Sequence, residues 1–192
     1  MADKTALPPA VDVSLSVEPS TFVPGRSARP TLTLTAISRA TQPITIFTWP
    51  TIFNLGLSQE RTNFTVHDLT SDTAISTETT KGPRRMEFSR NTGSGDDEFF
   101  VTLQPEVPRV FSHSFALAMH EADCRPSLQE GHRFRFAVSE GEVVQHWWYG
   151  IRKDVMASSW RPRVGLLAPS GEPIQLISVE PLEFDIKQSK EE

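Results

Sequence analysis

Hydrophobic and polar residues alternate over much of the chain, a pattern typical of β-strands that bury one face. In residues 11–17, Val11, Val13, Leu15 and Val17 alternate with aspartate and serine. Similar alternation, or enrichment in β-branched residues, predicts strands at residues 31–35, 44–49, 64–68, 99–103, 110–117, 132–138, 174–179 and 182–186. Because these runs are short and turn residues separate them, the pattern predicts an all-β sandwich or barrel.

One segment combines helical spacing with a cluster of large aromatic residues. In residues 143–156, apolar residues recur every four positions, as on one face of a helix. However, Gly150 interrupts the run, and the aromatic residues before it favour extended backbone. We therefore expect an extended aromatic segment up to Gly150 and one short helix from Ile151 to about Ala157.

Length and composition indicate one globular domain. The chain has 192 residues, of which 38% are hydrophobic and 22% charged, enough to bury a core without disulfides or a structural metal. We expect a single domain over residues 11–186, with flexible ends at residues 1–10 and 187–192. Residues 70–97 are rich in serine, threonine, glycine and aspartate, which predicts a mobile loop or, alternatively, a functional lid.

Net charge and the absence of targeting signals in the sequence indicate which cellular compartment and which classes of partner to expect. A net charge of −5 argues against a general nucleic-acid binder, because such proteins carry a basic field. The first residues lack the basic start and apolar run of a secretory signal, and no stretch is apolar over the ~18 residues of a membrane span. We therefore expect a cytoplasmic protein without nucleic-acid or membrane partners, in which Cys124, the only cysteine, is reduced.

Several short motifs lie between residues 28 and 186, among them Pro-Ile-Thr-Ile-Phe-Thr-Trp at residues 43–49, Trp-Trp-x-Gly at 147–150 and Val-Glu-Pro-Leu-Glu-Phe at 179–184. With these motifs the chain resembles an uncharacterised fungal-type family of intracellular immunoglobulin-like β proteins. The first half is also faintly similar to immunoglobulin-like domains of the intracellular proteinase-inhibitor type, in which a Leu-Thr-Leu strand precedes a Pro-Ile-Thr-Ile strand. The resemblance implies an immunoglobulin-like antiparallel β-sandwich with long loops and one short helix, and it brings no established activity.

Two histidines are candidate catalytic residues. His113 alternates with Phe111 and Phe115, and His132 shares a strand face with Phe134. If both imidazoles point between the sheets, they line a cavity and serve as acid and base. The alternative is that each histidine sits at a strand end and bonds to the backbone.

No motif indicates a metal, a cofactor or an activated nucleophile. Residues 120–124, His-Glu-Ala-Asp-Cys, hold four side chains of ligand type, but their spacing fits no familiar metal site. The sequence has no Gly-x-Ser-x-Gly elbow, no phosphate-binding loop and no dinucleotide fingerprint. We therefore predict neither a metal site nor a cofactor.

The aromatic segment is the candidate binding site. Trp147, Trp148 and Tyr149, with Arg152 nearby, form a stacking surface if they are exposed, because such side chains dominate binding hot spots. If they are buried, they anchor the short helix to the sandwich. Since adjacent residues of a strand face opposite ways, we expect one tryptophan to be buried and the other to face solvent with Tyr149.

These observations predict an intracellular binding or protein-interaction module. Its ligand, a protein or a small molecule, and its oligomeric state are left open by the sequence. The alternative is a small cofactor-free enzyme, such as an isomerase, cyclase or hydrolase, with a histidine-containing pocket between the sheets. An inward pocket containing His113 or His132 favours the enzyme, whereas an exposed tryptophan face over a filled core favours the module.

Overall fold

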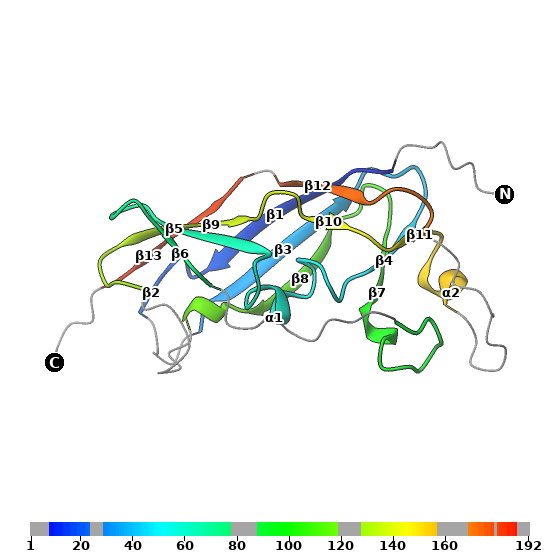
Figure 1. The fold of residues 1–192 in the computed structure, drawn as a ribbon, viewed down its shortest axis with the longest axis horizontal. Coiled ribbons are helices and arrows are strands. Elements are labelled where there is room, and N and C mark those ends of the chain that lie inside the picture. The colour runs from blue at the N-terminus through cyan, green and yellow to red at the C-terminus, as the bar shows by residue number, and fades with distance from the viewer. Residues whose placement is uncertain are drawn as a thin grey trace.

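The fold is mostly β-structure with a few short helical turns (Figure 1). The computed structural model describes residues 8–23, 29–77, 88–118, 128–156, 169–178 and 180–187. The strands are β1 (Val11–Glu18), β2 (Thr21–Phe22), β3 (Thr31–Ser38), β4 (Ile44–Phe47), β5 (Phe64–Asp68), β6 (Thr73–Ile75), β7 (Phe100–Leu103), β8 (Arg109–Ser114), β9 (Arg133–Val138), β10 (Val143–Val144), β11 (Trp147–Tyr149), β12 (Ile174–Ser178) and β13 (Leu182–Ile186). The α-helices are α1 (Leu55–Ser58) and α2 (Arg152–Val155), and the 3-10 turns are η1 (Asp97–Phe99) and η2 (Ala116–Ala118).

The described strands form three sheets. The first sheet has the order β10-β12-β1-β3-β8, the second β2-β13-β9-β5-β6, and the third β11-β4-β7. Figure 1 shows the second sheet towards the left-hand end and the third towards the right-hand end, with β1 and β3 running diagonally between them. Strands β8 and β7 therefore lie at the edges of two different sheets.

The alternating pattern of the sequence places one apolar core between the sheets. Val13 and Leu34 point inward from the first sheet, Phe134 and Phe184 from the second, and Ile46 from the third, and all five are at most 1% exposed. The polar residues between them face outward because successive side chains of a strand point to opposite faces. All nine predicted strand regions contain a strand, so the prediction of an all-β protein is confirmed.

The direction of two strand pairings and the number of short helices differ from the expectation based on the sequence. The sheets were expected to be antiparallel, but β1 pairs with β12 and β2 pairs with β13 in parallel. Side-chain alternation is the same in both directions, and strands far apart in the chain need no hairpin, so the pattern could not reveal this. The described residues form two short α-helices rather than one: α2 was predicted, whereas α1 has only four residues and no side-chain cap.

A second group of apolar residues, the outer cluster, covers the opposite face of the third sheet. It comprises Phe47, Phe100, Trp148, Val155 and Met156. Alternation within β4, β7 and β11 sends one set of side chains to the main core and the other set to this cluster. The third sheet is therefore buried on both faces.

The polar segment at residues 70–97 begins and ends in folded structure. Strand β6 lies within it and pairs with β5. At its other end Phe88 stacks on Phe47 with a centroid distance of 4.2 Å, and both Arg90 and Asp96 are buried. Residues 78–87 lie outside the described residues, so the predicted mobility of the loop concerns a part of the chain that the structure leaves undescribed.

Candidate functional site

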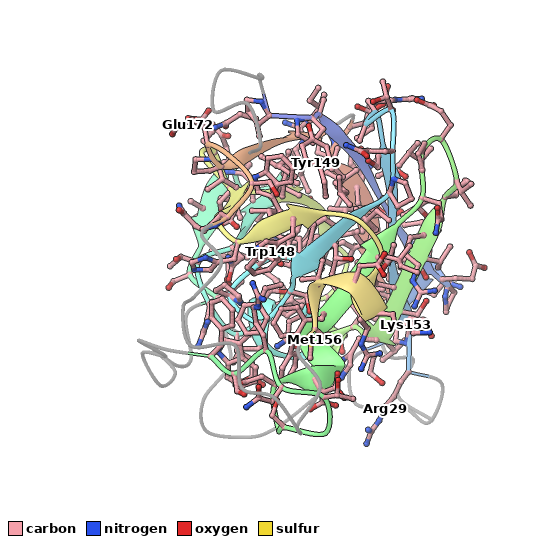
Figure 2. All side chains as sticks on the ribbon, turned by 90° about the vertical axis from the view of Figure 1, so that its right-hand side faces the viewer. Arg29, Trp148, Tyr149, Lys153, Met156 and Glu172 are labelled. Carbon is pink, nitrogen blue, oxygen red and sulfur yellow. The ribbon has the colours of Figure 1, made fainter. Side chains whose placement is uncertain are left out.

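The aromatic segment is a packing element and offers no stacking face. Trp147 is 1% exposed and belongs to the main core, where its indole Nε1 donates a hydrogen bond of 2.9 Å to the carbonyl of Glu172. Trp148 is 5% exposed and lies in the outer cluster, with the guanidinium of Arg90 5.4 Å from its ring centroid. Figure 2 shows Trp148 amid closely packed side chains, with Glu172 at the periphery. The expectation that one tryptophan faces solvent is wrong, because the third sheet has a core on each side.

The other two residues of the predicted binding surface are also engaged. Tyr149 is half-buried, and its ring meets the Trp147 ring edge-on at 5.0 Å. The guanidinium of Arg152 is exposed but forms an ion pair with Asp97 of η1. The hydrogen bond from Arg152, together with one from the backbone N–H of Gly93, lowers the pKa of Asp97. The four residues thus join β11, α2 and η1 to one another.

His132 is held by a buried carboxylate. Its Nδ1 lies 2.7 Å from Oδ2 of Asp68, while Oδ1 of Asp68 accepts the backbone N–H groups of Thr70 and Ser71. Burial on its own raises the pKa of Asp68, but the bonds from His132 and from the Thr70–Ser71 turn outweigh it and lower the pKa to about 2. The pair therefore closes the turn between β5 and β6 and ties it to β9.

A cleft opens beside the edge strand β8, and apolar side chains, two charged side chains and a histidine line it together. We name it the β8 cleft; its volume is about 300 Å³, at the lower end of the range for small-ligand sites. Its apolar lining consists of Phe53, Leu55, Phe99, Val101 and Phe111. Its polar lining consists of Thr48, Asn54, Glu98, Arg109, Ser112 and His113, with Gly56 at the helix.

The sequence places these groups together because of how β8 alternates. Arg109, Phe111 and His113 share the face of β8 that continues the core side of β3, since Phe111 and His113 lie opposite the buried residues Leu34 and Leu32. Among the described strands β8 is the last of its sheet, so no further strand continues this face beyond it. Helix α1 and the ring of Phe53, 5.2 Å from the Phe111 ring, cover it in part and leave the cleft.

His113 is exposed in this cleft rather than enclosed between the sheets. Its Nδ1 lies 3.1 Å from the carbonyl oxygen of Ser114. A carbonyl only accepts, so Nδ1 carries the proton and Nε2 holds the lone pair in the neutral ring. Nε2 packs on Gly56, where an added β-carbon would lie 3.1 Å away. His132 is in another sheet and does not line this cleft, so the two imidazoles do not share it.

The two charged side chains of the cleft, Arg109 and Glu98, form no ion pair with each other in the described structure. Arg109 lies with its guanidinium carbon 6.0 Å from the Phe111 ring centroid, and no carboxylate among the described residues forms an ion pair with it. Glu98, on η1, also lines the cleft. An unpaired guanidinium beside an apolar surface is available to a carboxylate of a ligand.

His146 provides a pH-dependent prediction outside the cleft. Its ring lies 4.9 Å from the Phe88 ring, and desolvation by burial lowers its pKa below the ordinary value of 6.5. The folded protein therefore binds a proton less readily than the unfolded chain, and this contribution to stability is complete above pH 6.5 and is lost as the pH falls below it. We expect His146→Leu to flatten the stability profile between about pH 7 and 5. Urea titration at several pH values measures this, and identical slopes in wild type and His146→Leu would contradict it.

Sequence reasoning identified His113 but missed the rest of the cleft. Phe53, Leu55 and Gly56 come from a short segment with no periodicity, Phe99 comes from η1, and Val101 comes from the third sheet. The one usable signal was the alternation of Phe111 and His113 on the strand predicted at residues 110–117, which Arg109 directly precedes. The metal-type cluster at residues 120–124 lies outside the described residues, and within those described no group of three or more His, Cys, Asp or Glu side chains is arranged to hold a metal ion.

Comparisons add no assignment to these observations. No family model, no curated protein and no solved structure matches the chain. In the part of the chain that the structure describes, no helix has the length and apolar character needed to cross a membrane.

Proposed function

We propose that the protein is a binding module, built as an immunoglobulin-like β-sandwich, whose ligand site is the β8 cleft. One observation carries the proposal: the apolar lining of the cleft, the guanidinium of Arg109 and the edge of β8 meet at one place on the surface, and among the described residues neither the guanidinium has a carboxylate partner nor the edge a further strand. Ligand sites combine an apolar lining with a few polar groups in this way. The cleft therefore suits a ligand that places an apolar group against Phe53 and Phe111 and a carboxylate near Arg109.

A cofactor-free enzyme is the second candidate, and the presence of His113 in the cleft favours it. The lone pair on Nε2 is suited to a general base, and Glu98 lines the same cleft. The two proposals differ in what His113→Gln should do. The module predicts that the affinity for ligands stays within about twofold, whereas the enzyme predicts that turnover of its substrate is lost.

Small aromatic probes test the binding site directly. We expect 3-phenylpropionate to bind with a Kd of about millimolar order, as fragments of this size do. Val101→Phe, which puts a ring into the cleft, should abolish binding. Arg109→Glu should lower the affinity for 3-phenylpropionate and leave the affinity for the neutral 3-phenylpropionamide unchanged. Lys187→Glu is the matched charge reversal, directly after β13 in the second sheet, whose label lies to the left of the β8 label in Figure 1, and it should have no effect.

Saturation-transfer NMR measures these affinities, and the free energy of unfolding of each variant shows that it is folded. Equal binding to wild type and Val101→Phe would place the ligand elsewhere and contradict the proposal. Hydrolysis of p-nitrophenyl ester probes that His113→Gln abolishes would favour the enzyme instead.

A further inference from the structure

We infer that the partner of the β8 cleft is an extended peptide segment that adds to the free edge of β8 as a further strand and inserts one apolar side chain into the cleft. This inference rests on the proposed function of the cleft and names the class of partner. Strand addition joins main-chain hydrogen bonds, which give affinity, to side-chain pockets, which give specificity. The structure holds both elements side by side.

The backbone groups on the free edge follow from the register of β8. Strand β8 pairs with β3 in regular antiparallel register, and the N–H of Phe115 donates to the carbonyl of Pro30 at 2.8 Å. In such a ladder, residues alternate between pointing both backbone groups at the partner strand and pointing both away. Val110, Ser112 and Ser114 therefore direct their N–H and C=O groups away from β3. The Ser114 carbonyl confirms this, because the side chain of Gln59 donates to it at 3.2 Å.

The rest of this edge is available. Gln59 of the α1 segment closes the Ser114 end, and within the described residues no strand pairs with Val110 or Ser112 on this side. The edge also lacks the usual protection against added strands. Residues 109–114 contain no proline and no lysine, and Arg109 is their only charged residue. Val110 is 55% exposed, and Val107, just before β8, is 54% exposed.

The alternation of β8 also sets the chemistry of the peptide. A strand laid beside β8 places alternate side chains on the cleft side, level with Arg109, Phe111 and His113. The peptide residue level with Phe111 contacts the apolar lining of the cleft, so we expect it to be aromatic or branched aliphatic. Its neighbour two positions along lies beside the unpaired guanidinium of Arg109, so it is aspartate or glutamate. For a partner strand that runs parallel to β8, the segment therefore reads acidic, any residue, apolar.

A synthetic octapeptide, acetylated and amidated, with the sequence Thr-Thr-Asp-Thr-Phe-Thr-Thr-Thr is the probe. Two forms of it carry backbone N-methyl groups on one or the other alternate set of residues. In an added strand only one set of N–H groups faces β8, so one form should lose at least about tenfold in affinity and the other should stay within about threefold. Equal affinities for the two forms would overturn strand addition. Replacing the peptide phenylalanine with alanine should also lower the affinity by at least about tenfold.

Ser112→Pro and Ser112→Ala are the matched pair on the protein. Proline removes an N–H that points away from β3, so the ladder with β3 is kept and the edge bond to the peptide is lost. We expect Ser112→Pro to weaken the peptide at least about tenfold and Ser112→Ala to leave it unchanged. If Ser112→Pro lowers the stability of the protein, the two N-methylated peptides still test strand addition, because their affinities are measured on the wild-type protein.

The outcomes separate this inference from the proposed function. Binding of 3-phenylpropionate in the cleft without an effect of N-methylation would keep the cleft as a ligand site and overturn the peptide partner. Absence of both kinds of binding would contradict the proposed function itself. A dimer in analytical ultracentrifugation that Ser112→Pro dissociates would assign the edge to a second copy of this chain and likewise overturn the peptide partner.

Discussion

Alanine at Trp147 is expected to lower the free energy of unfolding by about 3–5 kcal/mol, and alanine at Trp148 by a similar amount. Each substitution leaves a cavity the size of an indole between surfaces that cannot collapse, because the third sheet is fixed by its pairing on both sides of β4. Trp147→Ala also leaves the carbonyl of Glu172 without its donor, and Trp148→Ala exposes the face on which Arg90 packs. Two large losses at adjacent positions follow from two separate cores.

Urea titration of both variants measures the effect. Ile151→Ala, at a residue that is 39% exposed and directly precedes α2, is the control and should cost less than about 1 kcal/mol. A loss below about 1 kcal/mol at either tryptophan would show that its ring is not anchored as described, and would restore it as a candidate for recognition.

Asp68→Ala is expected to cost about 2–4 kcal/mol, because it leaves the backbone N–H groups of Thr70 and Ser71 and the half-buried Nδ1–H of His132 without an acceptor. Asp68→Asn keeps the shape but not the charge, so it should recover only part of the loss. Asp72→Asn, at an exposed carboxylate that bonds to His67, is the control and should be close to neutral. Thermal and urea unfolding at pH 7 decide between these values, and equal losses for Asp68→Ala and Asp72→Asn would contradict the account.

The same carboxylate predicts how the protein responds to acid. The pKa of Asp68 is lowered to about 2 from 3.8, so the folded state releases this proton more readily than the unfolded chain. The stabilisation is therefore present above about pH 4 and is lost as the pH falls towards 2, and it amounts to about 1–2 kcal/mol after screening near the surface. Stability profiles of wild type and Asp68→Asn should converge in this range. Parallel profiles down to pH 2 would contradict the lowered pKa.

The strands were predictable because a period of two is a local property of the sequence. The pattern from Val11 to Val17 needs no knowledge of its neighbours, and it gave β1 with the correct inward face. Pairing partners were not predictable in the same way. Whether β1 lies beside β12, and in which direction, depends on contacts between residues far apart in the chain.

The candidate site was predictable only in part, for the same reason. Aromatic residues at 147–149 attracted the prediction because large apolar side chains mark both binding surfaces and cores. The sequence cannot show that β11 has apolar layers on each face, since those layers come from distant segments such as Phe88 and Phe100. His113 was identified on its strand, but the cleft around it exists because β8 is an edge strand, a property of the sheet order.

The most direct test of the central claim, that the β8 cleft is the binding site, is a ¹H–¹⁵N NMR titration of the wild-type protein with the octapeptide. We expect the largest amide shifts at Val110 and Ser112, whose N–H groups lie on the free edge, and at Leu55 and Gly56 of α1 across the cleft. Largest shifts on the outer face of the second sheet, around Arg133 and Arg135, with β8 unchanged, would contradict the claim.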